Sequence, residues 1–153
     1  MRTYLAVIGG GVCDERVAAL AEAVGEEAAR RGLVLVCGGL GGVMEAACRG
    51  ARRHRGTTIG LLPSYDRGTG NPWLEIALPT GLGHARNVLV VAASDAVVAL
   101  AGEHGTASEI HLARVLGKPV VACCAWEEVE DVVHATSPRE AVERALALIG
   151  KRG

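Results

Sequence analysis

The sequence contains no phenylalanine, and only 3% of its 153 residues are aromatic. We therefore expect a core of Val, Leu, Ile and Ala, side chains that suit helices packed closely on a parallel sheet. A formal net charge of −1 provides no surplus of positive charge for a nucleic-acid groove or an anionic membrane surface, so we expect neither partner. No apolar run reaches the ~18 residues that a membrane-spanning helix needs.

Several common site signatures are also missing. The five cysteines are odd in number and form no C-x-x-C pair, which argues against a disulfide scaffold and favours a reducing, cytoplasmic setting. The spacing of the histidines matches no metal motif, so we expect no bound metal. No lysine follows a glycine turn as in a P-loop, and no G-x-G-x-x-G is followed by an acidic residue at the expected distance. P-loop nucleotidases and ordinary dinucleotide-binding proteins are therefore disfavoured.

Apolar, β-rich runs alternate with helix-like stretches along the whole chain. This alternation predicts a single α/β domain over residues 1–153, with a Rossmann-like, doubly wound, mainly parallel sheet flanked by helices. The expected strands are 3–8, 33–37, 57–62, 74–79, 95–100, 119–124 and an edge strand at 132–135. The expected helices are 14–31, 43–55, 84–94, 105–116 and 137–149.

Four glycine-rich turns, at 9–11, 38–42, 80–83 and 102–106, fall where strands are expected to end. Ligands of doubly wound sheets bind at the carboxyl ends of the strands. Helix starts hold anions there with unpaired N–H groups, and glycine lets the backbone approach closely. The turns therefore predict a cradle for a small phosphorylated ligand, with these candidate binding residues: Gly10, Gly11, Gly38, Gly39, Gly41, Gly42, Gly102, Gly105 and Thr106.

Each of these assignments also has a purely structural alternative that needs no ligand. Four glycines within 38–42 exceed what one turn needs and favour close contact with a ligand, with packing against another segment of the chain as the alternative. Glu45 would lie in the first turn of a helix, where a carboxylate is favourable in any case. Thr106 and Glu109 have the spacing of a capping box, so Thr106 could cap a helix rather than bind phosphate.

Arg86 is expected just inside a helix start, where a cation opposes the helix dipole. Such a position indicates a partner, either a ligand phosphate or a carboxylate such as that of Glu109. The turn-rich stretch 63–72 is long for a connection in a compact domain, and we interpret it as a mobile flap beside the site.

Three segments in order, GGLGGVMEAA (38–47), TGLGHARN (80–87) and GEHGTASEI (102–110), with Gly117-Lys118-Pro119, resemble the Lonely Guy (LOG) superfamily. Its phosphoribohydrolase branch cleaves nucleoside 5′-monophosphates to a free base and ribose 5-phosphate. That resemblance implies Arg86 and Glu109 as catalytic residues. This chain departs from the branch motif, with Ala101 for a proline, Glu103 for a glycine and Asn87 for a lysine.

The Arg86-Asn87 pair and the run that contains Met44 and Glu45 look closer to a second branch, the molybdenum-cofactor carrier-like proteins. These bind the phosphate-bearing molybdopterin cofactor without altering it. The resemblance therefore implies a carrier or sensor that binds a nucleotide, phosphate or molybdenum cofactor, with Met44, Glu45 and Asn87 added to the site and no cofactor required for a reaction. It also implies a homodimer or homotetramer, for which the helices at 43–55 and 105–116 are candidate contacts.

The alternative function is N-glycosidic hydrolysis, which passes through an oxocarbenium-like sugar. Glu109 would stabilise that positive charge or activate water, while Arg86 would hold the phosphate or keep Glu109 ionised.

Overall fold

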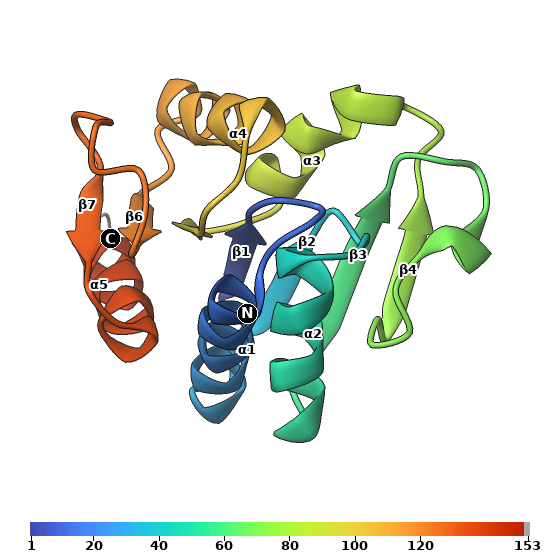
Figure 1. Ribbon diagram of the computed structural model, residues 1–153, viewed down its shortest axis with the longest axis horizontal. Coiled ribbons are helices and arrows are strands. Elements are labelled where there is room, and N and C mark those ends of the chain that lie inside the picture. The colour runs from blue at the N-terminus through green and yellow to red at the C-terminus, as the bar shows by residue number, and fades with distance from the viewer. Residues whose placement is uncertain (152–153) are drawn as a thin grey trace.

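The computed structural model describes residues 1–151 as a three-layer α/β protein around one seven-stranded sheet (Figure 1). The strands pair in the order β4-β3-β2-β1-β5-β6-β7, and every pair is parallel. Their bounds are β1 Tyr4–Ile8, β2 Val34–Cys37, β3 Thr58–Leu62, β4 Ile76–Pro79, β5 Ala96–Ala99, β6 Val120–Cys123 and β7 Val133–Ala135. The expected doubly wound fold is confirmed.

Within residues 1–151, four α-helices and two 3₁₀ turns lie between the strands, and a fifth helix follows β7. The helices are α1 Glu15–Arg30, α2 Val43–Arg53, α3 Asn87–Ala92, α4 His104–Val115 and α5 Pro138–Gly150. The 3₁₀ turns are η1 Arg67–Thr69 and η2 Gly83–Arg86. Asp14 and Ser137 cap α1 and α5 by accepting hydrogen bonds from backbone N–H groups, as their sequence positions predict. No helix within residues 1–151 is long and apolar enough to cross a membrane.

Alternate residues of the central strands face opposite layers, so both faces of the sheet are buried. Leu5 and Val7 of β1 belong to the core shared with α1, α2 and α5. Ala6 and Ile8 belong to the second core, beneath α3 and α4. The strands are therefore continuous apolar runs, which explains why the sequence shows them so clearly.

The backbones of α1 and α2 are in direct contact at two glycines. A Cβ on Gly25 would lie 1.9 Å from the Ala47 carbonyl oxygen, and a Cβ on Gly50 would lie 1.9 Å from that of Glu22. The small-residue face of α2 is thus buried against α1 of the same chain. That face is not available for the contact between subunits that we expected of it.

One sequence expectation needs correction, and a second stays a prediction. The helix expected over 84–94 is divided into η2 and α3, because Gly83 has a φ of 56° and the chain makes a 3₁₀ turn before α3 begins. The stretch 63–72 contains η1 and is fixed at one end: Asn71 donates its backbone N–H to Gly39 and its side-chain amide to Leu40. Its movement as a flap remains a prediction.

Candidate functional site: a cavity at the strand-order switch

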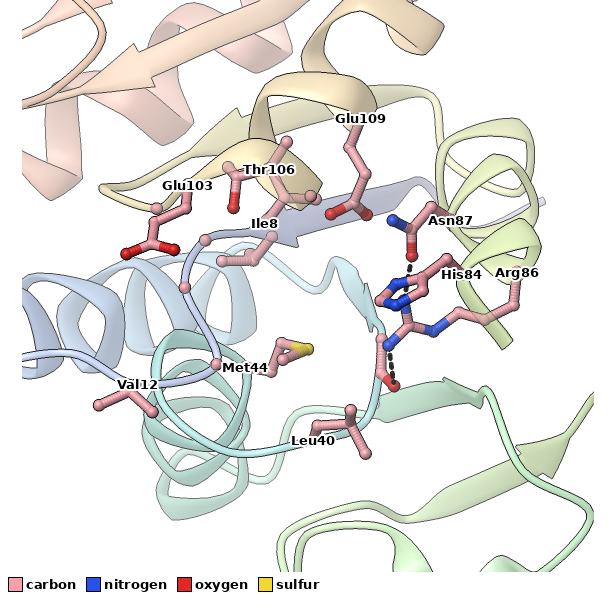
Figure 2. A pocket seen from close by; sticks show the side chains of 17 residues that line it. Ile8, Val12, Leu40, Met44, His84, Arg86, Asn87, Glu103, Thr106 and Glu109 are labelled. Carbon is pink, nitrogen blue, oxygen red and sulfur yellow. Dashed lines mark hydrogen bonds between the residues drawn. The ribbon is translucent and has the colours of Figure 1, made fainter. Parts of the chain in front are cut away.

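The order of the strands reverses at β1, which has β2 on one side and β5 on the other. A cavity of about 440 Å³ opens at the carboxyl ends of β1 and β5. The turns after β1, β2 and β5 contribute to its wall, together with η2 and the start of α3 (Figure 2). This is the position at which doubly wound sheets bind ligands.

Hydrogen bonds join the three turns directly. Gly10 donates its N–H to the Ala101 carbonyl at 2.9 Å and accepts from the Val43 N–H at 3.0 Å. Gly42 has a φ of 62°, and a Cβ there would lie 2.3 Å from the Gly10 oxygen. A Cβ on Gly39, whose φ is 78°, would lie 2.5 Å from the Leu62 side chain. Close contact between chain segments therefore accounts for Gly39 and Gly42.

Unpaired amides lie at the start of α4. The N–H groups of His104, Gly105 and Thr106 find no hydrogen-bond acceptor in the described chain, and no side chain caps the helix. The helix begins at His104, so Thr106 and Glu109 both lie inside it and form no capping box. Gly105 and Thr106 line the cavity, and a Cβ on Gly105 would meet no atom within 4 Å. This end of the cavity is suited to an anion.

Arg86 is buried, with 7% of its surface exposed, and its guanidinium is held by three acceptors. Nε donates to the Leu61 carbonyl at 2.8 Å, and Nη2 donates to the Gly38 carbonyl at 3.3 Å. Nη1 donates to the side-chain oxygen of Asn87 (Figure 2). A guanidinium has five N–H donors, so one remains on each terminal nitrogen for a ligand. Burial lowers the pKa of Arg86, and the charge of Glu109 counteracts this.

Glu109 lies one turn into α4, and its carboxylate points into the cavity (Figure 2). The residue is 8% exposed. Within residues 1–151 its carboxylate accepts no hydrogen bond and forms no ion pair, so the proposed direct pair with Arg86 is absent. Burial raises the pKa of Glu109 to about 7, and the more distant Arg86 charge partly offsets the rise.

Ten of the predicted site residues line this one cavity: Gly10, Gly11, Gly38, Met44, Arg86, Asn87, Gly102, Gly105, Thr106 and Glu109. Four others lie outside its lining: Gly39, Gly41, Gly42 and Glu45. The sequence reasoning did not include seven lining residues, namely Val7, Ile8, Gly9, Val12, Leu40, His84 and Glu103. Gly9, Leu40 and Glu103 had a usable signal, since they lie inside glycine turns already singled out, and His84 directly follows one.

Two buried thiols lie behind the β2 turn. The sulfur atoms of Cys37 and Cys48 are 3.5 Å apart, and the Gly39 N–H donates to Cys37. Hydrogen bonding from Cys48 lowers the pKa of Cys37, while the same contact and burial raise that of Cys48. No group of three or more His, Cys, Asp or Glu side chains in the described residues could hold a metal ion.

The fold and the cavity define a doubly wound α/β protein with a cavity at the point where the strand order reverses. Residues 2–147 match the model of the SLOG cluster4 family, and the chain belongs to that family. This agrees with the resemblance to the LOG superfamily and its molybdenum-cofactor carrier-like branch. An uncharacterized protein of Archaeoglobus fulgidus is 40% identical over 143 residues, which cover 94% of each chain.

Two solved structures are similar over almost their full length. The molybdenum cofactor binding protein of Rippkaea orientalis has a TM-score of 0.93 and 34% identity, covering 97% of this chain and 98% of its own. The molybdenum cofactor carrier protein of Chlamydomonas reinhardtii has a TM-score of 0.90 and 31% identity, covering 98% of this chain and 99% of its own. DNA processing protein A of Helicobacter pylori, at 22% identity and a TM-score of 0.71, shares the fold alone.

Proposed function

We propose that this protein binds a small phosphorylated ligand of the molybdopterin or nucleotide type in the switch-point cavity, and serves as a carrier or sensor of it. One observation carries the proposal: unpaired amides of α4 and a buried guanidinium with free N–H donors line the same cavity. Amides at a helix start and a fixed guanidinium are both strong phosphate ligands.

The residues present fit a phosphate-bearing ring compound. The cavity volume of about 440 Å³ lies in the range of small-molecule sites. Gly105 leaves open space over the amides, and Ile8, Leu40 and Met44 add apolar wall for a ring system. The similar molybdenum cofactor proteins of Rippkaea orientalis and Chlamydomonas reinhardtii support the same ligand class. The cofactor would be cargo here.

Binding can be tested by incubating the purified protein with isolated molybdenum cofactor under anaerobic conditions, followed by gel filtration. We expect molybdenum and pterin to elute with the protein, and ligand to raise the melting temperature. Arg86→Met should lose at least tenfold in affinity, because it removes both free donors. Arg16→Met is the matched control, since Arg16 is an exposed arginine of α1. Failure of molybdenum cofactor, AMP and inorganic phosphate alike to bind would refute the proposal.

Glu109 favours a second candidate, hydrolysis of nucleoside 5′-monophosphates. A carboxyl group with a pKa of about 7 is suited to general acid or base work near neutral pH. Chromatography of AMP and GMP incubations would detect free base, and Glu109→Gln should abolish its release. If no base forms while a phosphorylated ligand binds, the carrier or sensor function is retained and the hydrolase is excluded.

We also propose that the chain forms homodimers or homotetramers, in which α3 and α4 contribute the contact. Val88, Leu89 and Val115 are exposed apolar residues on these two helices, and exposed Leu116 directly follows α4. Light scattering should give a mass of two or four chains, and Val115→Asp should lower it. A monomeric wild-type protein would contradict this proposal.

A further inference from the structure

The buried carboxylate of Glu109 is a feature of the cavity that a phosphate does not explain. The amides of α4 and the donors of Arg86 suit negative charge, but Glu109 brings a further negative charge to the same space. A buried carboxylate without hydrogen-bond donors is unfavourable. Within residues 1–151 no donor contacts it. In the described chain, every fully buried side-chain oxygen has a hydrogen-bond partner. The Glu109 oxygens have none, so they are not fully buried and remain accessible from the cavity. A ligand in the cavity can therefore reach this carboxylate and supply the donors that the chain does not.

We infer that Glu109 determines ligand specificity by accepting two hydrogen bonds from a ring N–H and an adjacent exocyclic amino group, the edge that guanine and pterins share. This inference rests on the proposed function and names the ring that accompanies the phosphate. Two carboxylate oxygens match two parallel N–H donors, as they do with arginine. The corresponding edge of adenine places a ring nitrogen lone pair opposite the carboxylate, and would be rejected.

The positions of the residues agree with a ligand in this orientation. Figure 2 shows Glu103 and Thr106 at one end of the cavity, with Asn87 and Arg86 at the other, and Glu109 between them. Leu40 and Met44 lie across the cavity from Glu109. A planar ring between these side chains and Ile8 would bring its edge to Glu109, and the Met44 sulfur is a favourable neighbour for an aromatic face.

The test compares the affinities of four ligands by calorimetry at pH 8, where Glu109 is ionised: GMP, IMP, AMP and a pterin that carries one phosphate. We expect GMP or the pterin to bind at least tenfold more tightly than AMP, because hydrogen bonds to a charged group are among the stronger ones. IMP retains the ring N–H without the amino group and should fall between GMP and AMP. The comparison of GMP with the pterin identifies which ring is the source of this edge.

Glu109→Gln provides the decisive variant. A glutamine amide offers one donor and one acceptor, which is the pattern that pairs with adenine. The GMP-to-AMP affinity ratio should therefore fall at least tenfold, and the preference should move toward AMP. Glu103→Gln is the matched control, since it removes a carboxylate from the cavity end away from Arg86 (Figure 2). It should strengthen GMP and AMP binding equally and leave their ratio unchanged.

The outcomes separate the inference from the proposed function. If every phosphorylated ligand binds with one affinity, or if Glu109→Gln leaves the GMP-to-AMP ratio unchanged, the inference is overturned while phosphate binding stands. If none of the four ligands and no molybdenum cofactor binds, the proposed function fails first.

Discussion

The guanidinium of Arg86 donates to the carbonyl of Gly38, two residues that are 48 positions apart in the sequence. A Cβ at position 38 would lie 2.6 Å from the Arg86 Nη2 and 2.9 Å from the Met44 sulfur. Glycine at this position therefore allows the buried cation to reach the end of β2.

Gly38→Ala should lower the free energy of unfolding by about 1–3 kcal/mol, because the new methyl group must displace a side chain that three acceptors hold. Urea unfolding measures the change. Gly11→Ala is the control, since a Cβ on Gly11 meets no atom within 4 Å, and it should change stability by less than about 0.5 kcal/mol. Equal effects of the two substitutions would contradict the steric argument.

Gly105→Ala should separate stability from binding. Position 105 is helical and open, so alanine should stabilise the ligand-free protein by about 0.5–1 kcal/mol. The same methyl group would stand between the α4 amides and a phosphate, so affinity should fall severalfold in calorimetry. Gly150→Ala, in α5 and equally open, should give the stabilisation without the loss of affinity. Unchanged ligand affinity in Gly105→Ala would mean that no phosphate approaches these amides.

Gly50→Ala reverses the usual effect of alanine in a helix. Although alanine is the better helix former, its Cβ would lie 1.9 Å from the backbone oxygen of Glu22. Helices α1 and α2 would have to separate, and we expect a loss of about 3 kcal/mol or more in the free energy of unfolding. Gly150→Ala is the control, because it should raise the free energy of unfolding where Gly50→Ala lowers it. A neutral or stabilised Gly50→Ala protein would show that the helices do not make this backbone contact.

Arg86→Lys keeps the charge but not the fork of donors. A lysine ammonium cannot reach Leu61, Gly38 and Asn87 together, so at least one buried acceptor loses its donor. The expected loss is about 1–3 kcal/mol of stability, measured by urea unfolding. Arg16→Lys, on the exposed side of α1, should remain within about 0.5 kcal/mol of the wild type. If Arg86→Lys matches that control, the buried hydrogen bonds contribute nothing measurable.

Glu109 predicts a pH dependence of stability. Its pKa is raised from 4.5 to about 7 on folding, so between these values the native state binds more protons than the unfolded state. Stability should therefore fall as pH rises from about 4.5 to 7, by about 3 kcal/mol from this group, and level off above. Arg86, His84 and Glu103 are the charged or titratable side chains that share the cavity.

Glu109→Gln removes that titration. Relative to the wild type, the variant should gain stability as pH rises through this interval, and urea unfolding at pH 5 and pH 8 measures the difference. Glu103→Gln provides the control for charge at the cavity rim and should show no comparable change. Parallel pH profiles for the wild type and Glu109→Gln would refute the buried position of the carboxylate.

The fold could be predicted because the central strands are buried on both faces and therefore appear as continuous apolar runs, such as Leu5–Ile8. The glycine turns located the cavity, because strand ends and helix starts are local features of sequence. The division at Gly83 and the contacts of Arg86 with Leu61 and Gly38 were not predictable. They depend on distances between segments that no local pattern encodes. For the same reason Gly42, a packing residue, could not be distinguished from Gly38, which lines the cavity.

The hydrogen bonds from Gly10 to Ala101 and from Val43 to Gly10 affect the entropy of ligand binding. Because these hydrogen bonds hold the turns together in the ligand-free protein, the turns lose little conformational entropy when a ligand binds. Empty and filled crystals should superimpose closely around Gly10, with adjustments confined to side chains. A preformed binding site of this kind can discriminate among ligands by shape and release them without refolding.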